Sequence, residues 1–205
     1  MNERVILPAV PSLRPLERAH KVASFPPQIG MDCRVLVLGT VPSVRSLQLR
    51  QSYGHAQNLF WPFMGTLFDA GADLPYAERI RRLQAIGIGI WDVYKRVERR
   101  GSLDASIVRA SEVPNAIVPL LRRMPTIRAI VLNGGKAAEG YARHIAPQFD
   151  DALRDSIDIL KLPSTSPANA SIARAEKLRR WTILTRYVAA SPRDVPTPLS
   201  LGNQR

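Results

Sequence analysis

The sequence is poor in the residues that build covalent cross-links and metal sites. Cys33 is its only cysteine among 205 residues, which excludes an internal disulfide, a cysteine-based zinc site and the thiolate cage of an iron–sulfur cluster. Its three histidines, at positions 20, 55 and 144, are scattered and lack the HExxH spacing of a zinc protease. We therefore expect no metal site, and this cysteine usage is typical of the reducing cytoplasm.

Long apolar runs and common cofactor motifs are also missing. No stretch approaches the roughly 18 consecutive apolar residues of a membrane span, and prolines interrupt the first 20 residues, where a secretory signal needs a continuous apolar core. Asn133-Gly134-Gly135-Lys136 lacks the GxxxxGK[ST] frame of a phosphate-binding loop, and no GxSxG segment of a serine hydrolase is present. We expect no cofactor and no membrane association.

Acidic residues are scarce relative to basic ones. The chain has 17 Asp and Glu against 29 Lys and Arg, a formal net charge of +12 and a pI near 10.8. This excess favours a polyanionic partner such as DNA or RNA. An arginine-rich surface that serves only solubility gives the same composition, so charge alone leaves the partner open.

Strands and helices alternate along the chain. Short apolar runs at 33–38, 86–91, 127–132 and 157–162 predict four strands. Helices are predicted at 58–71, at 75–85, at 114–123, after Gly134-Gly135 and at 172–188, the last with Arg174, Lys177 and Arg180 on its polar face. This order predicts an α/β domain over 24–188 with a four-stranded, mainly parallel sheet covered on both faces, between tails at 1–23 and 189–205.

Two polar loops follow predicted strands. The longer runs from Gly39 to Trp61, and the shorter is Pro163-Ser164-Thr165-Ser166-Pro167-Ala168-Asn169. The carboxyl ends of the strands in an open α/β sheet are where ligands bind. We therefore expect both loops to line one site.

Four ordered blocks resemble a known family. Gly39-Thr40-Val41-Pro42-Ser43 with Tyr53-Gly54-His55-Ala56-Gln57-Asn58-Leu59-Phe60-Trp61 is similar to the first active-site region of the hypoxanthine-DNA glycosylase branch of the uracil-DNA glycosylase superfamily. The later blocks, which resemble the same branch, are Ile90-Trp91-Asp92-Val93 with Gly101-Ser102-Leu103-Asp104, Val131 to Ala137, and Pro163 to Ala170. The resemblance runs from about Phe25 to Tyr187.

The resemblance implies a three-layer α/β/α fold and a reaction. Such a protein binds single- or double-stranded DNA as a monomer, flips out a deaminated base, uracil or hypoxanthine, and hydrolyses its N-glycosidic bond to initiate base excision repair. No lysine is placed to form a Schiff base, so we expect a monofunctional enzyme. Cytoplasmic DNA, in the nucleoid of a prokaryote, is the expected place of action.

The resemblance also implies the catalytic and base-binding residues. Asn58 stands where this branch carries its catalytic asparagine, and its amide could orient the attacking water; the same side chain could instead only cap the helix that follows. His55 could act as an acid beside the leaving base, or be structural. The expected base-binding residues are Gly39, Thr40, Tyr53 as a stacking platform and Asn133 as a reader of the base edge; Tyr53 could instead be packing in its loop, and Asn133 capping a helix.

The DNA-binding residues are expected in the two polar loops, at the rim of the site. They are Ser43, Ser164, Ser166, Pro167 and Asn169, whose hydroxyl, amide and proline groups suit phosphate gripping and groove insertion. The Ser-Thr-Ser-Pro run could equally be ordinary helix-entry chemistry. Phe60 and Trp61 are expected in the core, and the paired arginines, such as those at 79, 81, 82, 99 and 100, on solvated faces.

Departures from the family pattern bear on the substrate. Ser52 stands where the branch commonly has a second tyrosine, Ser43 replaces a glycine and Ala56 a proline. These changes leave the preference between uracil and hypoxanthine open. Two other classes also stay open: a non-catalytic binder of damaged DNA, and an N-glycoside hydrolase that acts on nucleosides or RNA.

Overall fold

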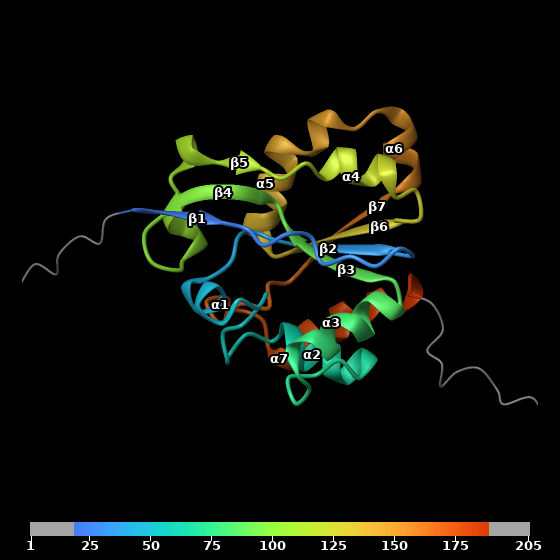
Figure 1. Ribbon diagram of the computed structural model, residues 1–205, viewed down its shortest axis with the longest axis horizontal. Coiled ribbons are helices and arrows are strands. Elements are labelled where there is room, and N and C mark those ends of the chain that lie inside the picture. Colours follow the sequence, from blue (N-terminus) through green and yellow to red (C-terminus); the bar gives the residue numbers. More distant parts are fainter. Residues whose placement is uncertain (1–18, 189–205) are drawn as a thin grey trace, which may run out of the picture.

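The computed structural model describes residues 19–188 (Figure 1). Residues 1–18 of the predicted N-terminal tail and all of the predicted tail at 189–205 lie outside the described residues. Within 19–188 the chain forms seven strands, seven α-helices and four short 3-10 helices, η1 (Asp104–Ser106), η2 (Arg109–Ser111), η3 (Ala146–Gln148) and η4 (Thr182–Arg186). None of the helices in this part of the chain is long and apolar enough to span a membrane.

Four parallel strands form the centre of the domain. They are β2 (Val35–Gly39), β3 (Ile88–Asp92), β6 (Ala129–Asn133) and β7 (Asp158–Leu162), in the order β3-β2-β6-β7. The predicted four-stranded sheet is confirmed, and it is parallel throughout. Gly39 pairs with Asp92 and Asn133 with Leu162, so the last residues of the strands share one edge of the sheet.

Helices cover both faces of this sheet, which confirms the three-layer α/β/α prediction. One face carries α2 (Phe60–Phe68), α3 (Tyr76–Ala85) and α7 (Arg174–Trp181), and the other carries α4 (Ile117–Arg123), α5 (Gly135–His144) and α6 (Asp151–Ser156) (Figure 1). Strand β2 is buried on both faces and alternates between two cores. Val35 and Val37 join the core of α2, α3 and α7, while Leu36 and Leu38 join that of α4 and α5.

A second, antiparallel sheet was not predicted from the sequence. It contains β1 (His20–Ala23), β4 (Tyr94–Arg99) and β5 (Val113–Pro114), in the order β1-β4-β5. Residues 20–23 were assigned to the N-terminal tail, and this boundary is wrong because β1 pairs with β4 along its whole length. The hydrophobic pattern that would predict these strands is weak, because Val22 is the only buried residue of β1 and four of the six residues of β4 are charged.

Three basic side chains differ from their predicted positions. Lys177 was placed on the polar face of the last helix, but it is 2% exposed, since it reaches back under the loop at 163–169. Arg99 is fully buried in β4, and Arg79 is buried with its guanidinium 4.8 Å from the Trp61 ring centroid.

The last helix is also shorter than expected, because the chain tightens into η4 after Trp181. Helix α1 (Val44–Leu49), which lies just after β2, was not predicted either.

Candidate active site

A pocket of about 420 Å³ lies at the carboxyl edge of the parallel sheet. Its walls come from the segment after β2, from the 102–105 segment, from the turn between β6 and α5, and from the loop after β7. The two loops singled out in the sequence therefore do line one cavity. A hydrogen bond from the Leu59 amide to the Thr165 carbonyl (2.9 Å) joins them directly.

Asn58 lines this pocket just before helix α2 begins. Its amide oxygen accepts a hydrogen bond from the Phe60 N–H at 2.9 Å. This bond between residues two apart holds the side chain at the helix entrance, while the N-cap position of α2 itself is Leu59. A carbonyl oxygen has a second lone pair and the amide nitrogen two protons, which leaves the group able to hold a water molecule in the pocket.

Tyr53 forms an aromatic wall of the pocket. Its backbone has a positive φ of 56°, and its ring stacks on Phe60 with centroids 4.0 Å apart and planes 21° from parallel. Phe60 is fully buried, as predicted, so it backs the Tyr53 ring from the core side. Burial, followed by the nearby Asp92 carboxylate, raises the pKa of the Tyr53 hydroxyl, which is therefore neutral at physiological pH.

Asn133 is tied to the loop after β7. Its amide oxygen accepts from the Thr165 N–H and its amide nitrogen donates to the Thr165 hydroxyl, both at 2.9 Å. Both residues are buried. The amide keeps one proton and one lone pair for a ligand, so its first role is to hold Thr165, with base recognition limited to what remains.

The loop after β7 is fixed from beneath by helix α7. The Lys177 ammonium donates to the carbonyls of Ser164 (2.8 Å) and Asn169 (2.5 Å), and the Trp181 indole donates to the Pro163 carbonyl at 3.0 Å. Burial lowers the pKa of Lys177, but these two carbonyls offset that cost because they accept from the charged form. Three hydrogen bonds from α7 side chains therefore hold the backbone of this loop.

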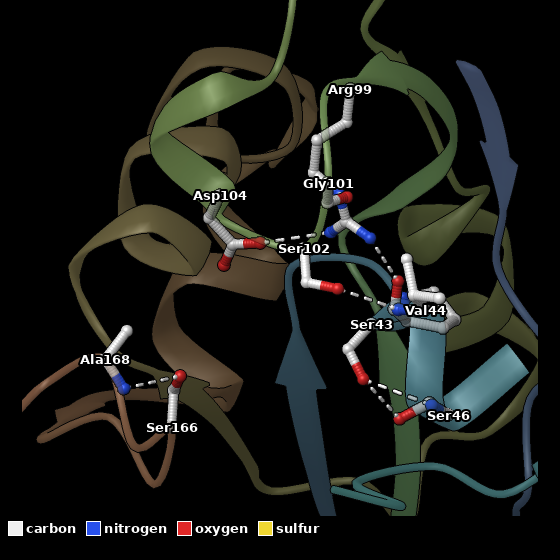
Figure 2. Close-up of polar contacts among 10 residues, drawn as sticks. Ser43, Val44, Ser46, Arg99, Gly101, Ser102, Asp104, Ser166 and Ala168 are labelled. Carbon is white, nitrogen blue, oxygen red and sulfur yellow. Dashed lines mark hydrogen bonds and ion pairs between the residues drawn. The ribbon is translucent and has the colours of Figure 1, made fainter. Parts of the chain in front are cut away.

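Two carboxylates, Asp92 and Asp104, line the same pocket, and both interact with the buried side chain of Arg99. Arg99 donates to the carbonyls of Pro42 (2.7 Å) and Gly101 (3.0 Å), and it lies 3.4 Å from an Asp104 oxygen (Figure 2). Burial raises the pKa of Asp104 in spite of the Thr40 hydroxyl and Arg99 beside it. For Asp92, burial and then the charge of Asp104 raise the pKa to about 7, against the opposing effect of Arg99.

Most residues expected from the sequence meet in this pocket, and two do not. Its lining includes the expected residues Gly39, Thr40, Ser43, Tyr53, Asn58, Asn133, Ser164, Ser166 and Asn169. His55 is exposed outside the lining, with its ring nitrogen accepting from the Gln57 N–H, and Pro167 is exposed on the loop tip. Ser43 caps helix α1 through the Ser46 N–H, and Ser102 accepts from the Val44 N–H (Figure 2).

Sequence reasoning missed Asp92, Asp104, Thr165 and Lys177. Asp92 carried a usable signal, because it is the acidic last residue of an apolar strand next to Gly39 in the sheet. Thr165 and Lys177 gave no such signal, since their roles depend on a crossing of two segments that the local sequence does not encode.

The chain is similar in sequence to proteins of one known family. A profile of the Uracil DNA glycosylase superfamily matches residues 26–185. A protein named hypoxanthine DNA glycosylase from Methanosarcina acetivorans is 30% identical over 165 residues, which cover 80% of this chain and 97% of that protein. One with the same name from Methanosarcina barkeri is 34% identical over 148 residues, which cover 67% and 91%.

A solved structure shares the fold. The solution NMR structure of a Methanosarcina acetivorans protein, described provisionally as a uracil DNA glycosylase, superimposes with a TM-score of 0.67 at 30% identity. The match covers 82% of this chain and 98% of that one. Sequence and structure therefore agree on one family.

Proposed function

The chain belongs to the uracil-DNA glycosylase superfamily, and from this premise we propose that this DNA glycosylase flips a deaminated base, hypoxanthine or uracil, into the pocket and hydrolyses its N-glycosidic bond. The observation that carries the proposal is the meeting of Asn58, Tyr53 and Asn133 in one cavity at the carboxyl edge of the sheet. The names of both Methanosarcina relatives favour hypoxanthine.

The base stacks on Tyr53 in this proposal. The ring is already held by Phe60, so little conformational freedom is lost when a base packs on its other face. Asn58 orients the attacking water towards the sugar, while the remaining proton and lone pair of Asn133 meet the base edge. Hypoxanthine and uracil both present a carbonyl beside a ring N–H, which one amide can pair with.

The loop after β7 grips the DNA backbone in this proposal. Its Ser164, Ser166 and Asn169 side chains lie on the pocket rim, and Lys177 fixes the carbonyls beneath them. The net charge of +12 supports the approach of a polyanion. The flipped base then enters between this loop and the segment after β2.

The enzyme is proposed to be monofunctional. Lys136 lines the pocket, but its ammonium forms an ion pair with Glu139 at 2.9 Å, and the Lys177 ammonium donates to two carbonyls. A Schiff base needs an unprotonated, accessible amine, which neither arrangement favours.

Excision from defined oligonucleotides tests the proposal. Single- and double-stranded DNA with one hypoxanthine or one uracil is incubated with the protein and treated with hot alkali. We expect strand breaks at the deaminated base only after alkali. Absence of abasic product from both bases in both forms would refute the enzyme, leaving a damaged-DNA binder if affinity persists. Breaks without alkali would refute monofunctional chemistry, and cleavage of free nucleosides without DNA preference would indicate a nucleoside hydrolase.

Tyr53→Leu is expected to weaken binding of DNA that contains the deaminated base. Loss of one base–aromatic stack costs about 1–3 kcal/mol, which is roughly a 5- to 150-fold rise in Kd. Tyr53→Phe is the matched control: the buried hydroxyl makes no hydrogen bond within residues 19–188, so its removal leaves Kd and stability almost unchanged. Equal Kd values for the leucine variant and the wild type would show that the base does not stack on Tyr53.

A further inference from the structure

None of the residues given a role in the proposed reaction can act as its general base. Hydrolysis of the N-glycosidic bond removes a proton from the attacking water, and the Asn58 amide has no useful basicity. His55, the histidine nearest to Asn58 in the sequence, lies outside the pocket lining. The two carboxylates of the lining, Asp92 and Asp104, are the groups in this pocket with the right chemistry.

Only one of these carboxylates is uncommitted. Asp104 interacts with Arg99 at 3.4 Å and with the Thr40 hydroxyl. The Asp92 carboxylate receives no hydrogen bond from a protein donor in residues 19–188. An acceptor without a protein donor that lines an open pocket is well placed to bind and deprotonate water.

The backbone keeps Asp92 open to the cavity. Gly39 is its neighbour across β2 and β3, and a side chain there would place its Cβ only 2.7 Å from an Asp92 oxygen and 3.2 Å from the Tyr53 hydroxyl. Glycine at 39 thus leaves room around Asp92 and Tyr53 in the pocket lining.

We propose that Asp92 is the general base of the reaction, an inference that rests on the proposed function. The Asp92 carboxylate takes a proton from the water held by Asn58, and the water oxygen forms a bond to the sugar C1′. The C1′–N bond breaks with its electron pair on the leaving base, which then takes a proton from solvent. An ionised Asp92 also stabilises the positive charge that develops on the sugar.

The charged groups around Asp92 set the pH range in which its carboxylate can accept a proton. Asp104 on η1 opposes ionisation of Asp92, Arg99 on β4 favours it, and the Tyr53 hydroxyl on the facing loop is neutral. Lys136 at the start of α5 acts on Asp104. The pKa of Asp92, about 7, makes it a stronger base than an ordinary carboxylate. Excision should therefore rise as pH increases through about 7 and then level off.

The test measures single-turnover excision by the wild type and Asp92→Asn between about pH 5.5 and 8.5. We expect the wild-type rate to rise about tenfold per pH unit on the acid side, and the variant to be about 100- to 10,000-fold slower with that limb lost. Asp155→Asn, an exposed carboxylate on α6, is the matched control and keeps the wild-type profile. Formate should partly rescue Asp92→Ala if a carboxylate is what is missing.

Each outcome decides one claim. If the wild type excises no base, the proposed function fails; if it does while Asp92→Asn keeps the same rate and pH profile, only the role of Asp92 fails. Because burial disfavours the Asp92 charge, its removal should not lower the melting temperature at pH 8. If the variant nevertheless fails to fold, a wild-type profile that is flat across this pH range overturns the proposal by itself.

Discussion

Asn58→Ala is expected to reduce the rate of base excision by about 100- to 1,000-fold, because a preorganised polar group beside the reacting atoms contributes on this scale. Its affinity for DNA with a deaminated base should stay close to that of the wild type, since Tyr53 and the loop after β7 are unchanged. Loss of the hydrogen bond to the Phe60 N–H should lower the free energy of unfolding by only about 1 kcal/mol. Single-turnover kinetics, gel-shift titration and urea denaturation measure the three quantities.

The matched control for this variant is Gln57→Ala. Gln57 is the preceding residue, is exposed and does not line the pocket. Its excision rate should equal that of the wild type. An Asn58→Ala protein that excises as fast as this control would show that Asn58 has only a structural role at the start of α2.

Lys177→Met is expected to destabilise the protein by about 2 kcal/mol, because two loop carbonyls lose a charged donor inside the protein. This loss of stability is partly offset, because the substitution also removes a charge whose burial is unfavourable. The loop at 163–169 should also lose its fixed shape. We therefore expect a large fall in DNA affinity and in excision at subsaturating DNA, measured by urea denaturation and by titration with labelled duplex.

Arg180→Met provides the comparison on the same helix. Arg180 is exposed and pairs with Glu176 at 2.7 Å, an arrangement worth well under about 1 kcal/mol. Its unfolding free energy and loop-dependent affinity should change little. Equal effects of the two substitutions would mean that Lys177 acts only through charge and not by holding the loop.

The central sheet and its loops were predictable because their signals are local. Each strand is a short apolar run, and β2 is buried at all five positions, so hydrophobicity alone identifies it. Once the strands lie parallel in one sheet, the loops after β2 and β7 both leave from its carboxyl edge, on either side of β6. The position of Asn58 and Tyr53 in a single pocket follows from that topology.

The rest depends on contacts between distant segments. Strand β4 could not be recognised in the sequence because most of its residues are charged. Its pairing with β1 and β5 stabilises it. A lysine in an amphipathic helix is normally exposed, and Lys177 is buried only because the loop carbonyls lie above it. The two hydrogen bonds between Asn133 and Thr165, which use half of the bonding capacity of the Asn133 amide, also depend on such a contact.

A structure with the free product base bound tests the central claim most directly. Crystals soaked with hypoxanthine, and separately with uracil, should show the base stacked on the face of Tyr53 opposite Phe60. Its glycosidic nitrogen should point towards Asn58 and Asp92. A base bound elsewhere, or turned so that its glycosidic nitrogen faces away from both residues, would contradict the account.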